Sequence, residues 1–427
     1  MMQQWFSSAK FGIFMHWGIY AVNGISESWS FYRGEISLDD YMAQCAGFDA
    51  SNYDPNAWAE LFEAAGARYA VLTTKHHDGI ALWDTQQNDA SVVKRTPAAR
   101  DLIAPYADAM RAHGIKVGLY YSHCDWVHPD FSPIPVKERG FANHNQTPYL
   151  DWPLGPKTEA WQRFLKFHRG QLTELATNYG EIDLFWFDGD WIPDNSYWNM
   201  IEVRDLLFKH QPTAINNSRL QGYGDYETPE QAIPVVAPAK PWEFCVTMND
   251  HWGYVPSDTN YKSVRELIQI LCECIGMGGN LLLDIGPRPD GTIPEEASVR
   301  LLAMGDWIKR HEAAIYPTKA GLPPGHLYGT STMSQDETEL FLFIFDKPFG
   351  EISLKGVRNQ IKRASIVGTG EELTTRISGG APWANIPGVM WLDMATATID
   401  PLCTVIRLEL DGKLDLYRGA GRAIEQN

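Results

Sequence analysis

The amino-acid sequence predicts an α/β fold, in which a (β/α)8-like, imperfect TIM barrel is followed by a C-terminal antiparallel β-sandwich. Short β-like runs alternate with amphipathic stretches from Phe11 to about Tyr316, as in βα units around a parallel sheet. About seven such units in about 315 residues is the size of a TIM-type barrel. Beyond Tyr316, short apolar or alternating runs separated by turn clusters are typical of antiparallel strands. These observations divide the chain into a barrel domain, residues 1–320, and a β-sandwich domain, residues 321–427.

The predicted barrel strands are short apolar runs, and the helices between them have apolar residues on one face. The predicted strands are 12–16, 69–75, 116–122, 182–188, 214–217, 242–247 and 280–285. The predicted helices are 56–65, 101–113, 158–178, 197–210 and 263–277. Gly66, Gly114 and Gly180 each stand just before a strand, where a helix-ending residue in the left-handed conformation belongs. In the C-terminal domain the predicted strands are 340–345, 352–354, 363–367, 396–399 and 405–410.

The composition excludes several classes of protein. Of the 427 residues 36 are basic and 53 acidic, so the net charge is −17 and we expect no nucleic-acid partner. Apolar runs such as 340–345 fall far short of the roughly 18 residues that a membrane span needs. The N-terminus lacks a basic stretch followed by an apolar one, and the six cysteines are scattered without a CxxC motif. Both features predict a cytoplasmic protein with reduced thiols. Nothing in the sequence indicates an oligomeric state.

Polar side chains gather where the predicted barrel strands end, which is where barrel enzymes place their active sites. The chain is also rich in aromatic residues, with 16 Trp, 18 Tyr and 18 Phe. Imidazoles and carboxylates can pair with hydroxyl groups, and flat indole faces can cover C–H groups. The set therefore predicts a pocket for a sugar. Its members at the strand ends include His16, His76, His77, Tyr120, Asp188, Arg219, Glu230, Glu243 and Trp252.

Metal and phosphate sites are not predicted. His76, His77 and Asp78 beside His16 are zinc-ligand types, but adjacent residues on an extended strand point to opposite faces, and no HExxH-type spacing accompanies them. The glycines at 276–279 follow a helix and precede a strand, the reverse of a dinucleotide or P-loop motif. We expect neither a metal nor another cofactor.

Seven blocks along the barrel resemble glycoside hydrolase family 29, the α-L-fucosidases, and occur in the same order. They are KFGIFMHWG at 10–18, AAGARYAVLTTKHHDG at 64–79, VGLYYS at 117–122, LFWFDG at 184–189, TPE at 228–230, WGY at 252–254 and GGNLLL at 278–283. The resemblance implies an imperfect barrel with a C-terminal β-sandwich, in agreement with the periodicity.

The resemblance also implies the catalytic pair. The family's Trp-x-Asp pattern makes Asp188 the nucleophile, with Glu230 in Thr-Pro-Glu as the acid/base. Glu243, in Trp-Glu, is the alternative acid/base. Such a pair would act by double displacement with retention, releasing terminal L-fucose from fucosylated oligosaccharides. The alternatives are an α-glycosidase of a related sugar, such as an α-L-galactoside, and a fucose-binding protein without turnover.

The remaining implied site residues would bind the sugar. Contacts to the fucose ring and hydroxyls would come from His16, His76, His77, Tyr120, Trp186 and Arg219, and Trp252 would pack near the methyl group. Glu27 and Trp29 correspond to a Glu-Trp pair that the family usually shows without the intervening Ser28. The TPE block at 228–230 and the residues at 249–254 look closer to the family branch selective for α-1,3/1,4-linked fucose.

Overall fold

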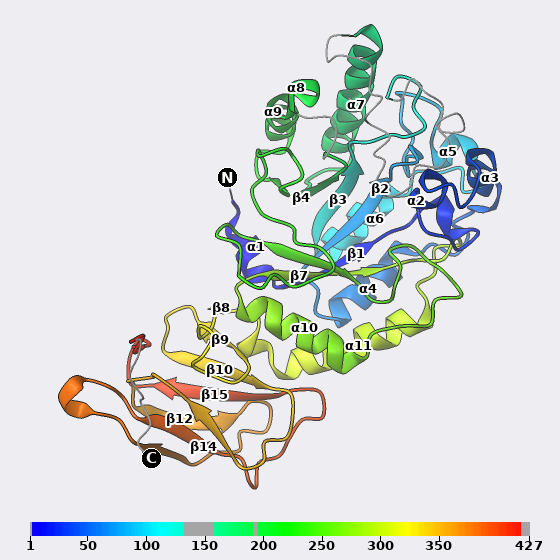
Figure 1. The fold of residues 1–427 in the computed structure, drawn as a ribbon. Helices are drawn as coiled ribbons and strands as arrows, with labels where there is room; N and C mark the ends of the chain where they lie inside the picture. Colours follow the sequence, from blue (N-terminus) through cyan, green and yellow to red (C-terminus); the bar gives the residue numbers. More distant parts are fainter. Residues whose placement is uncertain (1, 132–157, 191–194, 420–427) are drawn as a thin grey trace.

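A computed structural model describes residues 2–131, 158–190 and 195–419. Figure 1 shows a parallel sheet with helices around it and, below helices α10 (Val264–Gly276) and α11 (Glu295–Arg310), a separate group of C-terminal strands. The prediction of a barrel followed by antiparallel β-structure is confirmed. Within the described part of the chain, no helix is both long enough and apolar enough to cross a bilayer.

Seven parallel strands form the barrel sheet in the order β5-β4-β3-β2-β1-β7-β6. They are β1 (Phe11–Met15), β2 (Tyr69–Lys75), β3 (Lys116–Ser122), β4 (Leu184–Asp188), β5 (Ile215–Asn216), β6 (Glu243–Thr247) and β7 (Asn280–Ile285). Each predicted barrel strand is present with ends within two residues of the prediction. The strands are buried on both faces, as expected for a parallel sheet covered by helices.

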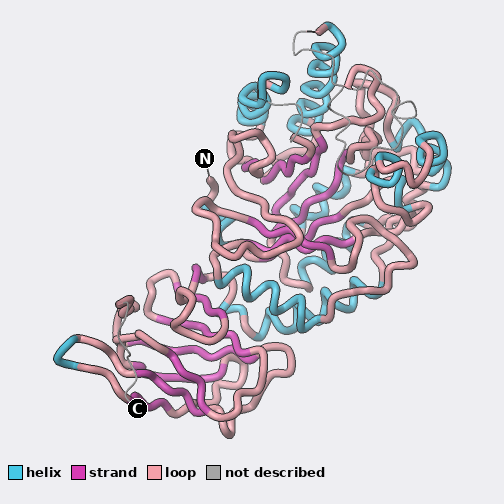
Figure 2. The backbone as a smooth tube through the Cα atoms, in the orientation of Figure 1, coloured by secondary structure: helices cyan, strands magenta, loops and turns pink. Residues whose placement is uncertain are grey.

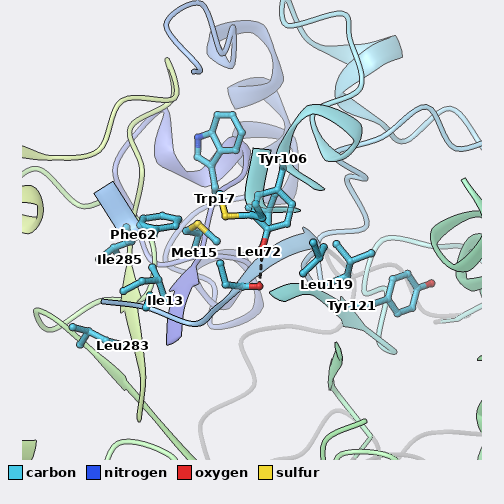
Figure 3. Packing of buried hydrophobic residues seen from close by; sticks show 14 of the residues in the cluster. Ile13, Met15, Trp17, Phe62, Leu72, Tyr106, Leu119, Tyr121, Leu283 and Ile285 are labelled. Carbon is cyan, nitrogen blue, oxygen red and sulfur yellow. Dashed lines mark hydrogen bonds between the residues drawn. The ribbon is translucent and has the colours of Figure 1, made fainter. Parts of the chain in front are cut away.

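Side chains along each barrel strand point alternately outward to the helices and inward to the barrel interior, so they form two apolar layers. Ile13 and Met15 of β1 belong to the large cluster between sheet and helices, together with Leu72 and Leu119 (Figure 3). Phe14, between them, belongs to a second cluster inside the barrel. Because successive side chains of a strand point to opposite faces, the inward set ends in polar groups at the carboxyl edge.

The edge strands β5 and β6 are joined by an irregular segment, residues 225–231, which we call the closing segment. It makes isolated parallel bridges between Asn217 and Tyr226, between Glu227 and Trp242, and between Glu230 and Cys245. The amide of Cys245 donates to the carbonyl of Pro229 at 3.1 Å, and Glu243 donates to Glu227 at 2.9 Å. Proline cannot donate to a sheet ladder, which explains why this part of the wall is not a regular eighth strand.

Helices surround the sheet (Figure 2). They are α1 (Gln4–Ala9), α2 (Trp29–Tyr32), α3 (Leu38–Ala43), α4 (Pro55–Ala64), α5 (Val92–Arg95), α6 (Ile103–Ala112), α7 (Glu159–Thr177), α8 (Asn195–Trp198) and α9 (Met200–His210), besides α10 and α11. Helix α1 packs against the apolar cluster inside the barrel, and Trp29 of α2 lies at the carboxyl edge. The prediction of one helix over 197–210 is wrong. Asn199 interrupts it with a left-handed conformation (φ 49°), which asparagine tolerates better than most residues. Helix α11 was not predicted.

The C-terminal part contains two antiparallel sheets. The first has the order β12-β15-β10-β9-β8 and the second β11-β14-β13. The strands are β8 (Thr318–Ala320), β9 (Thr330–Ser334), β10 (Glu339–Ile344), β11 (Glu351–Leu354), β12 (Ile361–Ile366), β13 (Thr375–Ser378), β14 (Val389–Asp393) and β15 (Thr404–Leu410). Both sheets contribute to one apolar cluster, which includes Leu342 and Leu392. The domain boundary at 320/321 stays a prediction; β8, which ends there, pairs with β9.

The predicted strand 396–399 is absent. Backbone amides around it donate to side chains instead of to a neighbouring strand. Ala395 donates to Asp393 at 2.9 Å, Thr398 to Glu371 at 3.0 Å, and Leu402 to Asp400 at 2.9 Å. Such local side-chain acceptors favour turns over ladders.

Candidate active site

A small pocket opens at the carboxyl edge of the barrel sheet. Its volume is about 130 Å³, which suits one ring rather than a chain of sugars. The lining combines rings with charged groups and consists of Phe14, His16, Trp29, His76, Tyr120, Trp186, Asp188, Arg219, Glu230 and Trp252. Nine of these ten residues were predicted as site residues, and they come from segments far apart in the sequence.

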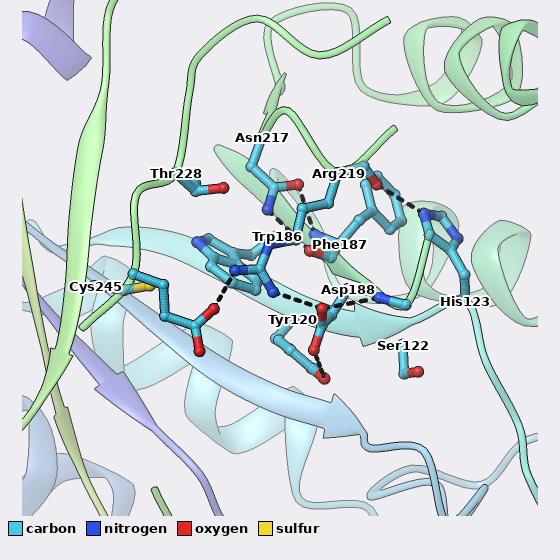
Figure 4. Close-up of polar contacts among 12 residues, drawn as sticks. Tyr120, Ser122, His123, Trp186, Phe187, Asp188, Asn217, Arg219, Thr228 and Cys245 are labelled. Carbon is cyan, nitrogen blue, oxygen red and sulfur yellow. Dashed lines mark hydrogen bonds and ion pairs between the residues drawn. The ribbon is translucent and has the colours of Figure 1, made fainter. Parts of the chain in front are cut away.

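Asp188 is the last residue of β4 and is almost fully buried. Its Oδ1 accepts from Arg219 at 2.6 Å and from the Gly189 amide at 2.8 Å, and its Oδ2 accepts from the Tyr120 hydroxyl at 3.0 Å (Figure 4). Burial alone would raise the pKa of this carboxyl group. Arg219, His77 and the hydrogen bonds from Arg219 and Tyr120 outweigh burial and hold the pKa below its usual range. Asp188 is therefore an ionised carboxylate at neutral pH.

Gly189 gives the turn after Asp188 its shape. Its φ of 79° lies in the left-handed region, and a Cβ there would come within 2.8 Å of the Cys124 sulfur. Glycine alone adopts this conformation without strain and fits this space. The turn directs the Gly189 amide at the Asp188 carboxylate.

Arg219 connects two carboxyl groups. One terminal nitrogen donates to Asp188 and the other donates to Glu230. The guanidinium carbon lies 4.6 Å from the centroid of the Trp186 ring, a cation–π contact. The backbone is fixed as well, since the Arg219 carbonyl accepts from His123 Nε2 at 3.1 Å. Asp188, Arg219 and Glu230 therefore form one ionic cluster on one wall of the pocket.

Three histidines lie beside this cluster, and each has its Nδ1 in a hydrogen bond. His16 Nδ1 lies 2.6 Å from Asp284, His76 Nδ1 lies 2.7 Å from Ser28 Oγ, and His77 Nδ1 lies 2.5 Å from Ser122 Oγ. Burial lowers the pKa of His16 to about 3 and that of His77 to about 4, and it lowers the pKa of His76 well below the usual value. The three imidazoles are neutral at neutral pH and suited to hydroxyl groups.

Comparison with known proteins decides the family. The family described as Alpha-L-fucosidase matches residues 1–313. The tissue alpha-L-fucosidases of Macaca fascicularis and Mus musculus are both 32% identical to this chain, over 74% of it and over 69% and 72% of their own lengths. The chain belongs to the α-L-fucosidase family. It is thus a glycoside hydrolase, as the sequence blocks predicted.

Solved α-L-fucosidases share the fold. Alpha-L-fucosidase isoenzyme 1 from Paenibacillus thiaminolyticus superposes with a TM-score of 0.83 at 34% identity, over 96% of this chain and 98% of that one. A Bacteroides thetaiotaomicron α-L-fucosidase has a TM-score of 0.80 at 25% identity, over 95% of both chains. That structure is described as a covalent intermediate trapped with 2-fluoro-fucosyl fluoride in a glutamate-to-glutamine mutant.

Three residues predicted for this fucosidase site do not line the pocket. His77 lies behind it, with Nε2 3.5 Å from Asp188 Oδ2. Glu27 is buried and accepts from the Gly253 amide at 3.0 Å. Glu243 was grouped with the residues at strand ends, and this placement is wrong, because it is the first residue of β6 and is fully buried. It lies beneath Trp186, which donates to it at 2.8 Å.

Phe14 and the partners of the histidines were not predicted. Phe14 of β1 lies two residues before His16, which directly follows the strand, so the inward face of β1 is a signal for it. Ser122 ends β3 and could have been found in the same way. Asp284 and Ser28 contact their histidines across 268 and 48 residues, and no spacing in the sequence indicates these contacts.

His76, His77 and Asp188 could in principle hold a cation, since their ligand atoms lie within 4.8 Å of one another. The argument that neighbouring histidines point apart was wrong. Both follow the end of β2 in a turn, and their ring centroids are 4.3 Å apart. A cation there would lie beside Arg219, which already neutralises Asp188. This charge disfavours a metal at the fucosidase pocket.

Proposed function

We propose that this α-L-fucosidase is a retaining exo-enzyme, which releases terminal L-fucose from fucosylated oligosaccharides by double displacement. The observation that carries the proposal is the ionic cluster of Asp188, Arg219 and Glu230 on one wall of a pocket for a single ring. Retention requires the two carboxyl groups to lie only ~5–5.5 Å apart. Asp188 and Glu230 both accept from the guanidinium of Arg219, and this shared partner supports such a short separation.

In the first step Asp188 attacks the anomeric carbon while the glycosidic bond breaks. Glu230, carrying a proton, transfers it to the departing oxygen, and a fucosyl ester of Asp188 forms. The hydrogen bonds from Arg219, Gly189 and Tyr120 keep Asp188 ionised for this attack. The covalent intermediate described for the Bacteroides thetaiotaomicron relative supports this route.

In the second step Glu230 is a carboxylate and takes a proton from water. The water oxygen bonds to the anomeric carbon, and the ester bond to Asp188 breaks. The contact from Arg219 to Glu230 would favour this ionised state. Two inversions at the same carbon give net retention.

The other lining residues would bind the sugar. Neutral imidazoles of His16 and His76 face the pocket for hydroxyl groups, with His77 behind them. Trp252, packed 5.0 Å from the His16 ring, offers an apolar surface for the C5 methyl group. Trp29 and Trp186 also line the pocket and would pack against the faces of the sugar ring. The small volume supports removal of one terminal sugar at a time.

Selectivity for α-1,3/1,4 linkages is part of the proposal and rests on the blocks at 228–230 and 249–254. The test compares hydrolysis of an aryl α-L-fucoside with that of an α-1,3/1,4-fucosylated trisaccharide, by wild type and by Asp188→Gly. We expect turnover that vanishes in the variant, with the α-anomer of fucose appearing first in proton NMR. Initial release of the β-anomer would contradict retention. Turnover of an α-L-galactoside but not of the fucosides would show that the substrate is that related sugar.

A further inference from the structure

Glu243 is a buried carboxyl group that the proposed mechanism does not use. It begins β6, on the floor of the barrel below the pocket, and its side chain is fully buried. Each oxygen accepts one hydrogen bond. Oε1 accepts from the Trp186 indole at 2.8 Å, and Oε2 accepts from the Tyr69 hydroxyl at 2.6 Å. Glu243 therefore joins β6 to β4 and β2 across the barrel interior.

Trp186 extends this link to the catalytic groups. Its ring carries the Arg219 guanidinium at 4.6 Å and stacks on Tyr120, with centroids 5.6 Å apart and planes at 21°. Arg219 and Tyr120 are two of the donors that hold Asp188. The orientation of the Trp186 ring therefore sets the position of both donors.

A buried indole N–H costs free energy unless it has an acceptor, so the acceptor fixes the rotation of the ring. Glu243 is that acceptor for Trp186. The charge of Arg219 also acts on Glu243: burial raises the pKa of Glu243 to about 7, while the hydrogen bonds from Tyr69 and Trp186 and the guanidinium oppose the rise. Glu243, Trp186 and Arg219 are therefore connected by direct contacts.

We propose that Glu243 is a positioning residue for the fucosidase reaction, which acts through Trp186 on Arg219 and transfers no proton to or from the substrate. The inference rests on the proposed role of Asp188 as nucleophile. It assigns the two candidate glutamates to different tasks, with Glu230 at the pocket and Glu243 beneath it.

The first test is the conservative variant Glu243→Gln, assayed on aryl fucosides with good and poor leaving groups. The amide oxygen still accepts from Trp186, so we expect kcat/KM within about threefold of wild type on both substrates. A loss of about 100-fold on the poor leaving group, together with faster turnover of the good leaving group when azide is added, would make Glu243 the proton donor and overturn the inference.

The second test is a double-mutant cycle of Glu243→Leu and Trp186→Phe. Each single variant removes one end of the hydrogen bond, and we expect each to lower kcat about 30-fold. The double variant should be no worse than either one, because both act through the same contact. If the loss of kcat in the double variant equals the product of the losses in the two single variants, the inference is overturned.

Controls separate this outcome from other failures. Tyr69→Phe removes the second donor to Glu243 without touching Trp186, and it should leave kcat within about threefold of wild type. Thermal unfolding reports whether Glu243→Leu folds; if it does not, Trp186→Phe alone decides, and unchanged kcat overturns the inference. Activity that survives in Asp188→Gly would instead refute the proposed function.

Discussion

The two sides of the barrel are built differently. Strands β1 to β4 pair in parallel along most of their length, with one register shift between β2 and β3, and they are almost entirely buried. His16, His76, Tyr120 and Asp188 lie at or near their carboxyl ends. Opposite them, β5 has only two residues, and the closing segment fills the gap to β6 through isolated bridges. The proposed nucleophile and the histidines proposed to bind the sugar lie on the regular side, whereas Trp252 follows β6. The proposed proton donor, Glu230, lies on the irregular side.

The difference matches the demands of the two tasks. A nucleophile must lie within a narrow distance of the anomeric carbon, and a strand end held by several hydrogen bonds supplies that precision. A proton donor must meet leaving groups of different shapes, and Glu230 is the more exposed carboxyl group, at 38% of its side chain against 13% for Asp188. Arg219, in the loop after β5, connects the two sides.

The largest effect is expected on the regular side. Asp188→Gly removes the nucleophile and should lower kcat roughly 10,000-fold on every fucoside, because no leaving group compensates for a missing nucleophile. Steady-state hydrolysis of an aryl fucoside checks this. Asp190→Asn is the matched control, since Asp190 accepts from the Gln221 amide outside the pocket. An equal loss of kcat in Asp190→Asn would contradict the assignment of Asp188, and not Asp190, as the nucleophile.

On the irregular side the effect should depend on the substrate. Glu230→Ala should lower kcat about 100- to 1,000-fold on a fucosylated trisaccharide, which needs protonation of its leaving oxygen. An aryl fucoside with a good leaving group should lose far less. Parallel assays of both substrates measure the ratio, and azide should restore turnover of the aryl fucoside. Identical losses on both substrates would show that Glu230 is not the proton donor.

Arg219→Lys tests the connection between the sides. A single ammonium group cannot hold two carboxylates with the geometry of a guanidinium fork, so we expect kcat to fall about 30- to 100-fold with the fold intact. Kinetics combined with circular dichroism measure this. Unchanged kcat would mean that the two carboxyl groups are held independently.

The smallest effect concerns stability and pH. Burial, opposed by hydrogen bonds from Tyr69 and Trp186, raises the pKa of Glu243 from 4.5 to about 7. Between these values the folded protein keeps a proton that the unfolded chain has lost, so stability falls as pH rises through this window. Glu243→Gln should remove up to about 3 kcal/mol of that fall. Urea unfolding at pH 5 and pH 8 checks the difference, and identical pH slopes in both proteins would contradict it.

The regular side was predictable from the sequence because its information is local. Strands 69–75 and 116–122 match to the residue, as does 280–285 next to this side, since each is one apolar run bounded by turns. The division of helix 197–210 and the missing strand 396–399 depend on backbone conformation and on side-chain acceptors, which periodicity does not contain. The place of Glu243 was missed for a different reason. The predicted strand 242–247 already begins beside Glu243, and β6 confirms that start, but Glu243 was grouped by residue type with the polar residues at strand ends.

The closing segment has a consequence for local unfolding. It is held by a few bridges and backbone hydrogen bonds, whereas the strands on the regular side pair in ladders of several residues. Cooperative units with fewer bonds open at lower free energy than the whole protein. The proton donor thus sits in the unit expected to open first, and the nucleophile in one expected to open late. On warming, the enzyme would then lose activity when the closing segment opens. Most backbone amides of the barrel strands would still be protected from hydrogen exchange at that temperature.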